Sequence, residues 1–167
     1  MSQTKMKPSP DPPLAPVRFE NGKTLLIAGL RVYYKTAPLE GSAEQWQRLA
    51  SYFGKIPGQM GNVGYGLCFL RPDGIDYLAG VLVAADSGLP NELATVQIPS
   101  QRYAVFGHDG HVSQLHKACQ QISEWLPTST LQVAKAEGSP DFFELYTEKF
   151  DPVKGVGGME IWVPIKK

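Results

Sequence analysis

The hydrophobic and polar positions of this chain alternate between a period of two and a period near four, which indicates strands mixed with helices. Residues 24–34 are rich in β-branched and aromatic side chains, a composition typical of a strand. Residues 43–53 place apolar side chains on one stripe at helical spacing, so we expect a helix that ends at Gly54. Ser42 is the candidate N-cap of this helix, with Gln45 at the capping-box position.

A hairpin is expected after this helix. Residues 64–70 and 75–84 are both rich in strand-forming side chains. They flank Pro72-Asp73-Gly74, whose residue types favour a tight turn. The first half of the chain therefore has the order strand, helix, hairpin.

The second half of the chain repeats this order. Its expected elements are strands at 93–98 and 103–106, a helix at 111–125, and strands at 142–150 and 159–165. We therefore predict an α+β fold made of duplicated strand-helix-strand-strand units. The two units would share an antiparallel sheet, with the helices on one side of it.

Residues 1–16 differ from the rest of the chain in composition. They hold five of the fourteen prolines and show no apolar periodicity, which is typical of a disordered or extended tail. The remaining residues, 17–167, have the length of one ordinary domain. We expect its two repeats at about 17–90 and 91–167.

Charge and apolar content restrict the class of partner. Lys+Arg and Asp+Glu are both 16, so the formal net charge is zero. Affinity for nucleic acid needs an excess of basic side chains, and we expect no direct binding to it. No apolar run approaches the roughly 18 residues of a membrane-spanning helix, and the N-terminus lacks the apolar centre of a signal peptide. We expect a cytoplasmic protein in which Cys68 and Cys119 are free thiols.

Candidate metal and cofactor motifs are weak. His108, His111 and His116 are close in sequence, but their spacing does not place them together on one helical face. Residues 155–158 are rich in glycine, yet they precede a strand and lack the Lys-Ser/Thr ending of a phosphate loop. The sequence therefore predicts neither a metal site nor an organic cofactor. Trp46 lies on a helical stripe, which favours a place in the core.

The last expected hairpin carries the residues that suggest a binding site. Alternate residues of a strand share a face, so Glu144 lies with Tyr146 and Glu160 lies with Trp162. With Leu145 in the core, we expect two carboxylates and two aromatic rings together on the opposite face. Such a face suits an organic cation through charge and cation–π attraction. The same alternation is also typical of an ordinary solvent-facing strand.

Several stretches of the second half, taken in order, resemble a known family. They are Tyr103-Ala104-Val105-Phe106, Ile122-Ser123-Glu124-Trp125-Leu126-Pro127, Phe143-Glu144-Leu145-Tyr146 and Glu160-Ile161-Trp162-Val163-Pro164-Ile165. In order and spacing, residues 95–166 are similar to the gyrase-inhibitor-like, AraC-type effector-binding domain family. The first half matches only in the order of its elements and in its hairpin.

The resemblance implies a ligand cavity between the two halves that binds hydrophobic, often cationic compounds. It also implies that acidic side chains of the last hairpin face the ligand. The implied ligand-binding residues are Glu160, Glu144, Tyr146 and Trp162, with Tyr33, Tyr65 and Tyr77 as further aromatic walls. Regulators of this family carry a DNA-binding helix-turn-helix region, and no basic recognition helix is visible here. We therefore expect a stand-alone domain that senses or sequesters a cationic, aromatic small molecule.

Two other functions stay open at this point. The resemblance extends to hydrolases, in which a pocket carboxylate with a raised pKa acts as general base toward water. Glu160, with Tyr146 as its partner, is then the candidate base. The family name also suggests a protein that binds and inhibits a DNA-handling enzyme, although a net charge of zero gives an acidic inhibitory surface no support. An exposed sheet edge could also pair two chains into a homodimer.

Overall fold

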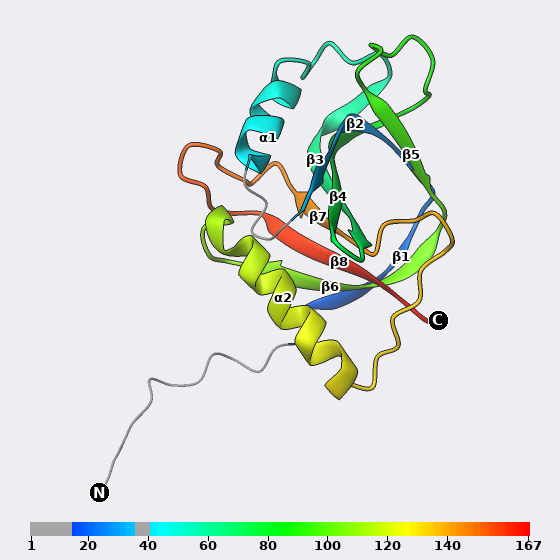
Figure 1. Ribbon diagram of the computed structural model, residues 1–167, viewed down its shortest axis with the longest axis vertical. Helices are drawn as coiled ribbons and strands as arrows, with labels where there is room; N and C mark the ends of the chain where they lie inside the picture. Colours follow the sequence, from blue (N-terminus) through cyan, green and yellow to red (C-terminus); the bar gives the residue numbers. More distant parts are fainter. Residues whose placement is uncertain (1–14, 36–40) are drawn as a thin grey trace, which may run out of the picture.

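The computed structural model describes residues 15–35 and 41–167 (Figure 1). Within these ranges, eight strands form one antiparallel sheet in the order β1-β6-β8-β7-β3-β4-β2-β5. The strands are β1 (Arg18–Gly22), β2 (Leu25–Tyr34), β3 (Gln59–Arg71), β4 (Gly74–Val83), β5 (Ala94–Ile98), β6 (Gln101–His108), β7 (Phe142–Tyr146) and β8 (Met159–Ile165). The helices are α1 (Ser42–Ala50) and α2 (Leu115–Trp125), with short 3-10 turns at Val112–Gln114 and Leu126–Thr128 on either side of α2.

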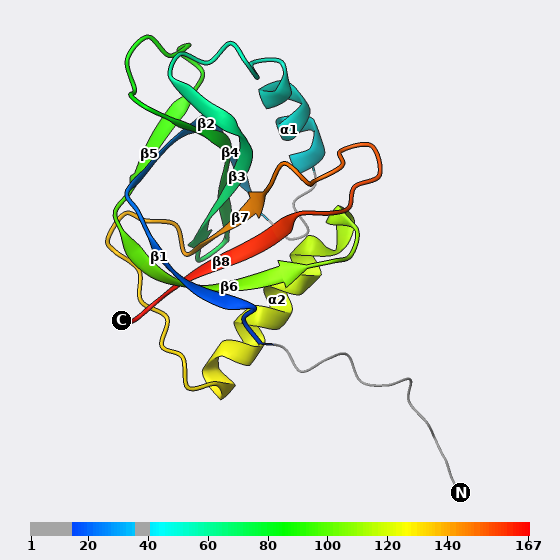
Figure 2. The same cartoon turned by 180° about the vertical axis from the view of Figure 1, so that it is seen from behind.

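The sheet is curled into a half-barrel (Figures 1 and 2). β1 lies at one edge beside β6, and β5 lies at the other edge beside β2. Residues 23–24 alone connect β1 to β2, and residues 99–100 alone connect β5 to β6. Such short links cannot span a flat sheet of this width, because neighbouring strands lie roughly 5 Å apart. The two edges therefore approach each other.

The predicted duplication is confirmed by the order of the elements. One unit is β2-α1-β3-β4 and the other is β6-α2-β7-β8. Their first hairpin strands, β3 and β7, pair at the centre of the sheet, where Gly66 lies opposite Glu144. Strand β1 is the element that the sequence pattern does not predict. Its five residues are largely exposed, so they show no apolar alternation.

The inner side of the curl is a filled apolar core. Its buried residues are Ile27, Leu67, Phe69, Leu78, Val96, Ile98, Tyr103, Val105 and Phe143. The rings of Tyr103, Phe143 and Trp162 contact one another at centroid distances of 5.3–5.5 Å. The inner side of the sheet is therefore packed with side chains.

Both helices pack on the outer side of the sheet (Figure 1). Leu49 of α1 is fully buried in a cluster with β2, β3 and β4. Leu115, Cys119 and Ile122 of α2 are buried against β6 and β8. The helix side thus holds two further core clusters, one in each unit. No helix in the described part of the chain is long and apolar enough to cross a membrane.

The start of α1 differs from the prediction. The N-cap is Gly41, whose φ is 94°, and no side chain caps the helix, so the predicted Ser42 cap is wrong. Gln45 is buried instead, where its Nε2 donates to the carbonyl oxygens of Leu30 and Tyr77 at 2.8 and 3.1 Å. A buried amide needs such partners, so the Gln45 side chain makes these bonds and does not cap the start of the helix.

Two predicted strand lengths also change. The predicted strand 142–150 ends at Tyr146, because Phe150 N donates to Thr147 O at 3.0 Å in a turn. Strand β3 begins at Gln59, before the predicted 64–70, and its pairing with β4 is shifted by a bulge between Gln59 and Gly64. Both differences lie at strand ends, where alternation is a poor guide to boundaries.

Candidate functional site

The register of the last hairpin separates the two candidate carboxylates. Across β7 and β8, Leu145 is paired with Glu160, and Glu144 is paired with Ile161. Directly paired residues of an antiparallel sheet point to the same face, so Glu144 and Glu160 point to opposite faces. The prediction that both carboxylates and their aromatic neighbours share one face is therefore wrong. Glu144 and Tyr146 lie on the outer, helix-bearing face, and Glu160 and its neighbour Trp162 lie on the inner face.

Glu144 is the centre of a hydrogen-bonded aromatic cluster on the outer face. Tyr77 of β4 donates to its Oε1 at 2.6 Å, and Tyr146 of β7 donates to the same oxygen at 3.0 Å. Trp46 of α1 donates its indole N–H to the Tyr77 hydroxyl at 3.0 Å. The Trp46 ring also meets Tyr146 edge-on, with 5.1 Å between ring centroids. Helix α1 and strands β4 and β7 thus direct aromatic side chains toward one carboxylate.

Two glycines of β3 make room for this cluster. A Cβ on Gly66 would collide with the Tyr77 hydroxyl and would lie 2.6 Å from Glu144 Oε1. A Cβ on Gly64 would lie 3.2 Å from the Trp46 ring. Because these positions carry no side chain, the hydrogen bond from β4 to β7 crosses over β3, the strand between them.

Burial controls the ionisation of Glu144, which is only 8% exposed. Loss of hydration disfavours the charged form and raises the pKa of this carboxyl group to about 7, while the hydrogen bonds from Tyr77 and Tyr146 limit the rise. Within the described ranges, no Lys, Arg or His side chain forms an ion pair with it. Glu144 can therefore exchange a proton near neutral pH, and its charged form has no cationic partner there.

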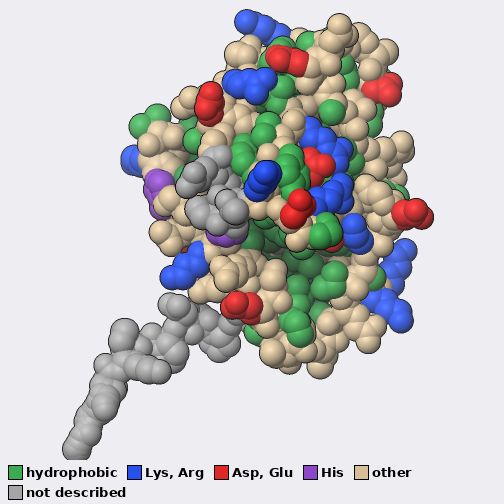
Figure 3. All heavy atoms as spheres, in the orientation of Figure 1, with side chains coloured by type: hydrophobic (Ala, Val, Ile, Leu, Met, Phe, Trp, Pro, Cys, Tyr) green, Lys and Arg blue, Asp and Glu red, His purple; other side chains and the backbone are tan. Residues whose placement is uncertain are grey.

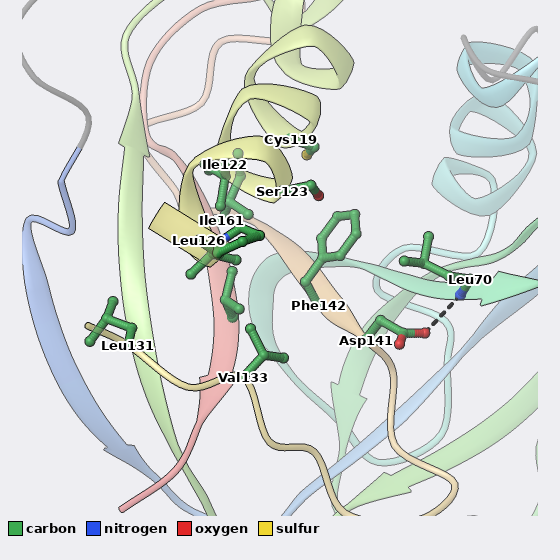
Figure 4. Close-up of a pocket in the computed structure, with 12 residues that line it drawn as sticks. Leu70, Cys119, Ile122, Ser123, Leu126, Leu131, Val133, Asp141, Phe142 and Ile161 are labelled. Carbon is green, nitrogen blue, oxygen red and sulfur yellow. Dashed lines mark hydrogen bonds between the residues drawn. The ribbon is translucent and has the colours of Figure 1, made fainter. Parts of the chain in front are cut away.

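A pocket of about 310 Å³ lies on the same face of the sheet, between α2, the segment that follows it and the end of β3 (Figure 4). It is lined by Leu70, Cys119, Ile122, Ser123, Leu126, Pro127, Leu131, Val133, Asp141, Phe142, Ile161 and Val163. Ile161 is the cross-strand partner of Glu144, and Phe142 projects from the same strand as Glu144 toward α2 (Figure 4). Figure 3 shows apolar side chains gathered beside α2 on this face. The pocket therefore adjoins the strand that carries Glu144, although its lining does not include Glu144, Tyr77 or Tyr146.

Glu160 has a different environment from Glu144. Arg18 of β1 donates to both of its carboxylate oxygens, at 2.6 and 3.0 Å. Trp162 donates its indole N–H to Glu160 at 3.0 Å, and the Arg18 guanidinium lies 5.6 Å from the Trp162 ring centroid. The hydrogen bonds from Arg18 lower the pKa of Glu160. This carboxylate therefore stays charged at neutral pH and already has a cationic partner.

Of the three further tyrosines, only Tyr77 reaches Glu144. Tyr65 lies on the inner face, where its ring is 5.7 Å from Phe143 between centroids. Tyr33 is 44% exposed and donates to Asp73 at 2.6 Å. The predicted set of seven residues is thus divided between the two faces.

Sequence reasoning placed Trp46 in the core and did not connect it to the site. The available signal was the Gly-Tyr-Gly stretch 64–66, in which both glycines point to the helix side of a central strand. A central strand that lacks side chains on one face leaves space for large side chains from its neighbours. Trp46, Tyr77 and Glu144 fill that space.

The remaining polar candidates are the histidines and the cysteines, which lie in the described part of the chain. In the part of the chain that the structure describes, no group of three or more His, Cys, Asp or Glu residues could hold a metal ion. His108 Nε2 contacts the carbonyl oxygen of His111, and His111 Nδ1 contacts the Ser113 hydroxyl. Cys68 and Cys119 are buried free thiols, and burial raises the pKa of each.

Solved structures share this fold. SAV2435 bound to tetraphenylphosphonium matches with a TM-score of 0.69 and 21% sequence identity, over 89% of this chain and 93% of that chain. The C-terminal domain of EcmrR matches with a TM-score of 0.64 and 12% identity, over 90% of this chain and 96% of that chain. At these identities, the likeness establishes the fold.

A sequence relative and a family match agree with the fold. The transcriptional regulator BrlR of Pseudomonas aeruginosa is 29% identical over 136 residues, which cover 80% of this chain and 49% of BrlR. The chain thus spans about half the length of that relative. Residues 15–166 match the family described as the GyrI-like small molecule binding domain. As the stretches of its second half predict, the chain belongs to this family of GyrI-like small-molecule-binding domains.

Proposed function

We propose that this domain binds hydrophobic, aromatic cations on the outer face of the sheet, with Glu144 as the counter-charge. The observation that carries the proposal is a buried carboxylate whose described partners are tyrosine hydroxyls, next to an apolar pocket. A buried charge without a counter-ion is costly. A cationic ligand would supply that counter-ion.

The surrounding side chains suit the same class of ligand. Trp46, Tyr77 and Tyr146 present aromatic rings around the carboxylate. The faces of such rings attract cations, by about 2 kcal/mol for each contact from which water is excluded. The pocket between α2 and β3 would receive the apolar body of the ligand, since most of its lining is aliphatic or aromatic.

A structural relative supports this ligand class. The solved structure of SAV2435 contains tetraphenylphosphonium, a cation surrounded by four aromatic rings. We extend that ligand class to this chain because Glu144 provides a charge of the opposite sign. Glu160, the other predicted ligand carboxylate, is a weaker candidate, since Arg18 already neutralises it.

The test compares two ions of the same shape and opposite charge. Tetraphenylphosphonium should raise the melting temperature at pH 8, because a ligand of the native state stabilises it, whereas tetraphenylborate should not. The Glu144→Gln variant should lose at least about tenfold in affinity for the cation, measured by calorimetry. The matched control is Glu160→Gln, a carboxylate of the same hairpin on the other face, which should bind as the unmodified protein does. Equal binding of both ions, or full affinity in Glu144→Gln, would contradict the proposal.

One observation favours hydrolysis as a second candidate function. A carboxyl group with a pKa of about 7 can accept a proton from water at neutral pH. The base would then be Glu144 with Tyr146, because Glu160 and Tyr146 lie on opposite faces. Incubation of an electrophilic aromatic ester with the protein distinguishes the two functions. Recovery of the unchanged compound supports binding alone, and product that is absent with Glu144→Gln supports turnover.

A further inference from the structure

The chain of hydrogen bonds that ends on Glu144 begins in helix α1. Trp46 Nε1 lies 3.0 Å from the Tyr77 hydroxyl oxygen, and that hydroxyl lies 2.6 Å from Glu144 Oε1. An indole N–H can only donate, so the Tyr77 oxygen must accept from Trp46. The Tyr77 hydroxyl proton is then free to point at Glu144. The chain therefore has one direction, from Trp46 through Tyr77 to Glu144.

Helix α1 holds Tyr77 at both ends. Gln45 Nε2 donates to the Tyr77 carbonyl oxygen at 3.1 Å, and the next residue, Trp46, donates to the hydroxyl. Gly64 and Gly66 leave the space through which the two rings reach across β3. The Tyr77 hydroxyl is thus fixed by α1 rather than by solvent.

We propose that Trp46, which is hydrogen-bonded to Tyr77 and not to the carboxylate itself, is a positioning residue that sets the pH range in which Glu144 accepts a cation. This inference rests on the proposed function. A hydroxyl that accepts a hydrogen bond is polarised and becomes a stronger donor. Donation from Trp46 therefore strengthens the Tyr77 hydrogen bond to the charged carboxylate, which stabilises the charged form.

The other titratable groups around Glu144 are uncharged, so the relay, meaning the hydrogen-bond chain from Trp46 through Tyr77 to Glu144, is a main control of its charge. Among the described residues, the titratable groups that face it are Tyr77 from β4, Tyr146 from its own strand β7, Cys68 from β3 and Cys119 from α2. Burial raises the pKa of all four, so they are neutral at physiological pH. Hydrogen bonds are then what stabilises the charged carboxylate against the effect of burial.

The test is the titration of Glu144 without ligand, followed by carboxyl-carbon NMR and assigned with the Glu144→Gln variant. Trp46→Phe keeps a ring against Tyr146 but removes the N–H donor. We expect it to move the Glu144 midpoint upward by about half a pH unit. The affinity for tetraphenylphosphonium should then reach its maximum at correspondingly higher pH. The matched control is Trp125→Phe, which changes a tryptophan that packs on Phe106 of the second unit and should leave the midpoint in place.

A second pair of variants tests the path of the effect. Tyr77→Phe should raise the midpoint by about one pH unit, because the carboxylate loses a hydrogen bond. Adding Trp46→Phe to Tyr77→Phe should then change nothing further. An unmoved midpoint in Trp46→Phe, or the same shift with and without the Tyr77 hydroxyl, would overturn the proposal.

The unmodified protein offers a measurement that needs no folded Trp46 variant. The indole N–H resonance of Trp46 should shift across the Glu144 midpoint, and it should not do so in Glu144→Gln. An indole N–H chemical shift that stays constant while Glu144 ionises would contradict the proposed role of Trp46. Both NMR titrations are made without ligand, so they test the role of Trp46 independently of binding. Failure of tetraphenylphosphonium to bind would instead contradict the proposed function.

Discussion

Glu144 and Glu160 point to opposite faces of the same hairpin, and their pKa values move in opposite directions. Burial raises the pKa of Glu144 from 4.5 to about 7. The hydrogen bonds from Arg18 lower the pKa of Glu160 below its ordinary value. The two carboxylates should therefore contribute to the free energy of unfolding with opposite dependence on pH.

The first prediction concerns Glu144. Because its pKa is higher in the folded state, the native protein holds an extra proton between pH 4.5 and 7, and stability is lost as pH rises through that window. The loss is about 3 kcal/mol for a shift of this size. Glu144→Gln carries no such proton, so its stability relative to the unmodified protein should increase by that amount from pH 4.5 to 8. Urea unfolding at both pH values measures it. If the variant and the unmodified protein differed in stability by the same amount at both pH values, burial would not perturb the pKa of Glu144.

The second prediction concerns the ion pair of Glu160 with Arg18. A lowered folded pKa stabilises the protein above the unfolded pKa near 4.5, and this stabilisation is lost as pH falls through the folded pKa. The Arg18 side chain is 40% exposed and therefore screened by solvent. We expect Glu160→Gln to lose about 1 kcal/mol at pH 7 and less in high salt. The control is Glu92→Gln, whose pair with Arg48 spans 3.5 Å at the surface and should contribute almost nothing.

Which residues share a face of one strand could be predicted from the sequence. The register between neighbouring strands could not. Period-two alternation correctly placed Glu144 with Tyr146 and Glu160 with Trp162. Which pair faces the helices depends on the register of the hairpin. Residues 147–158 connect its two strands, and a loop of this length does not fix the register as a two-residue turn does. A register one residue away would have brought the two carboxylates to one face.

The candidate site was only partly predictable for a related reason. Glu144 and Tyr146 were identified because they are neighbours on one strand. Their contacts with Tyr77 and Trp46 come from the pairing of β7 with β3 and from the docking of α1, which no local pattern encodes. The helices and most strands, in contrast, were predicted because their apolar periodicity is a local property of the chain.

The third prediction concerns Gly66, over which the Tyr77–Glu144 hydrogen bond passes. A methyl group there would push apart the Tyr77 hydroxyl and the Glu144 carboxylate. Gly66→Ala should cost about 2 kcal/mol of unfolding free energy, as expected for overpacking, and should weaken binding of tetraphenylphosphonium. The control is Gly107→Ala on β6, where a Cβ would meet only Val17 at 3.7 Å, an ordinary contact. Equal effects of the two substitutions would mean that the site has space above β3.

The fourth prediction tests whether the pocket beside α2 receives the apolar part of the ligand. Ser123 is an exposed residue of α2 that lines this pocket, so a tryptophan there would fill it while the core stays unchanged. Ser123→Trp should reduce the affinity for tetraphenylphosphonium by tenfold or more, which corresponds to about 1.4 kcal/mol. It should leave the binding of tetramethylammonium unchanged, because that cation has no aromatic body. The neighbouring Glu124→Trp, which adds the same side chain outside the pocket lining, controls for the added apolar surface. If Ser123→Trp bound both cations as the unmodified protein does, the apolar part of the ligand would have to lie elsewhere on the helix-bearing face.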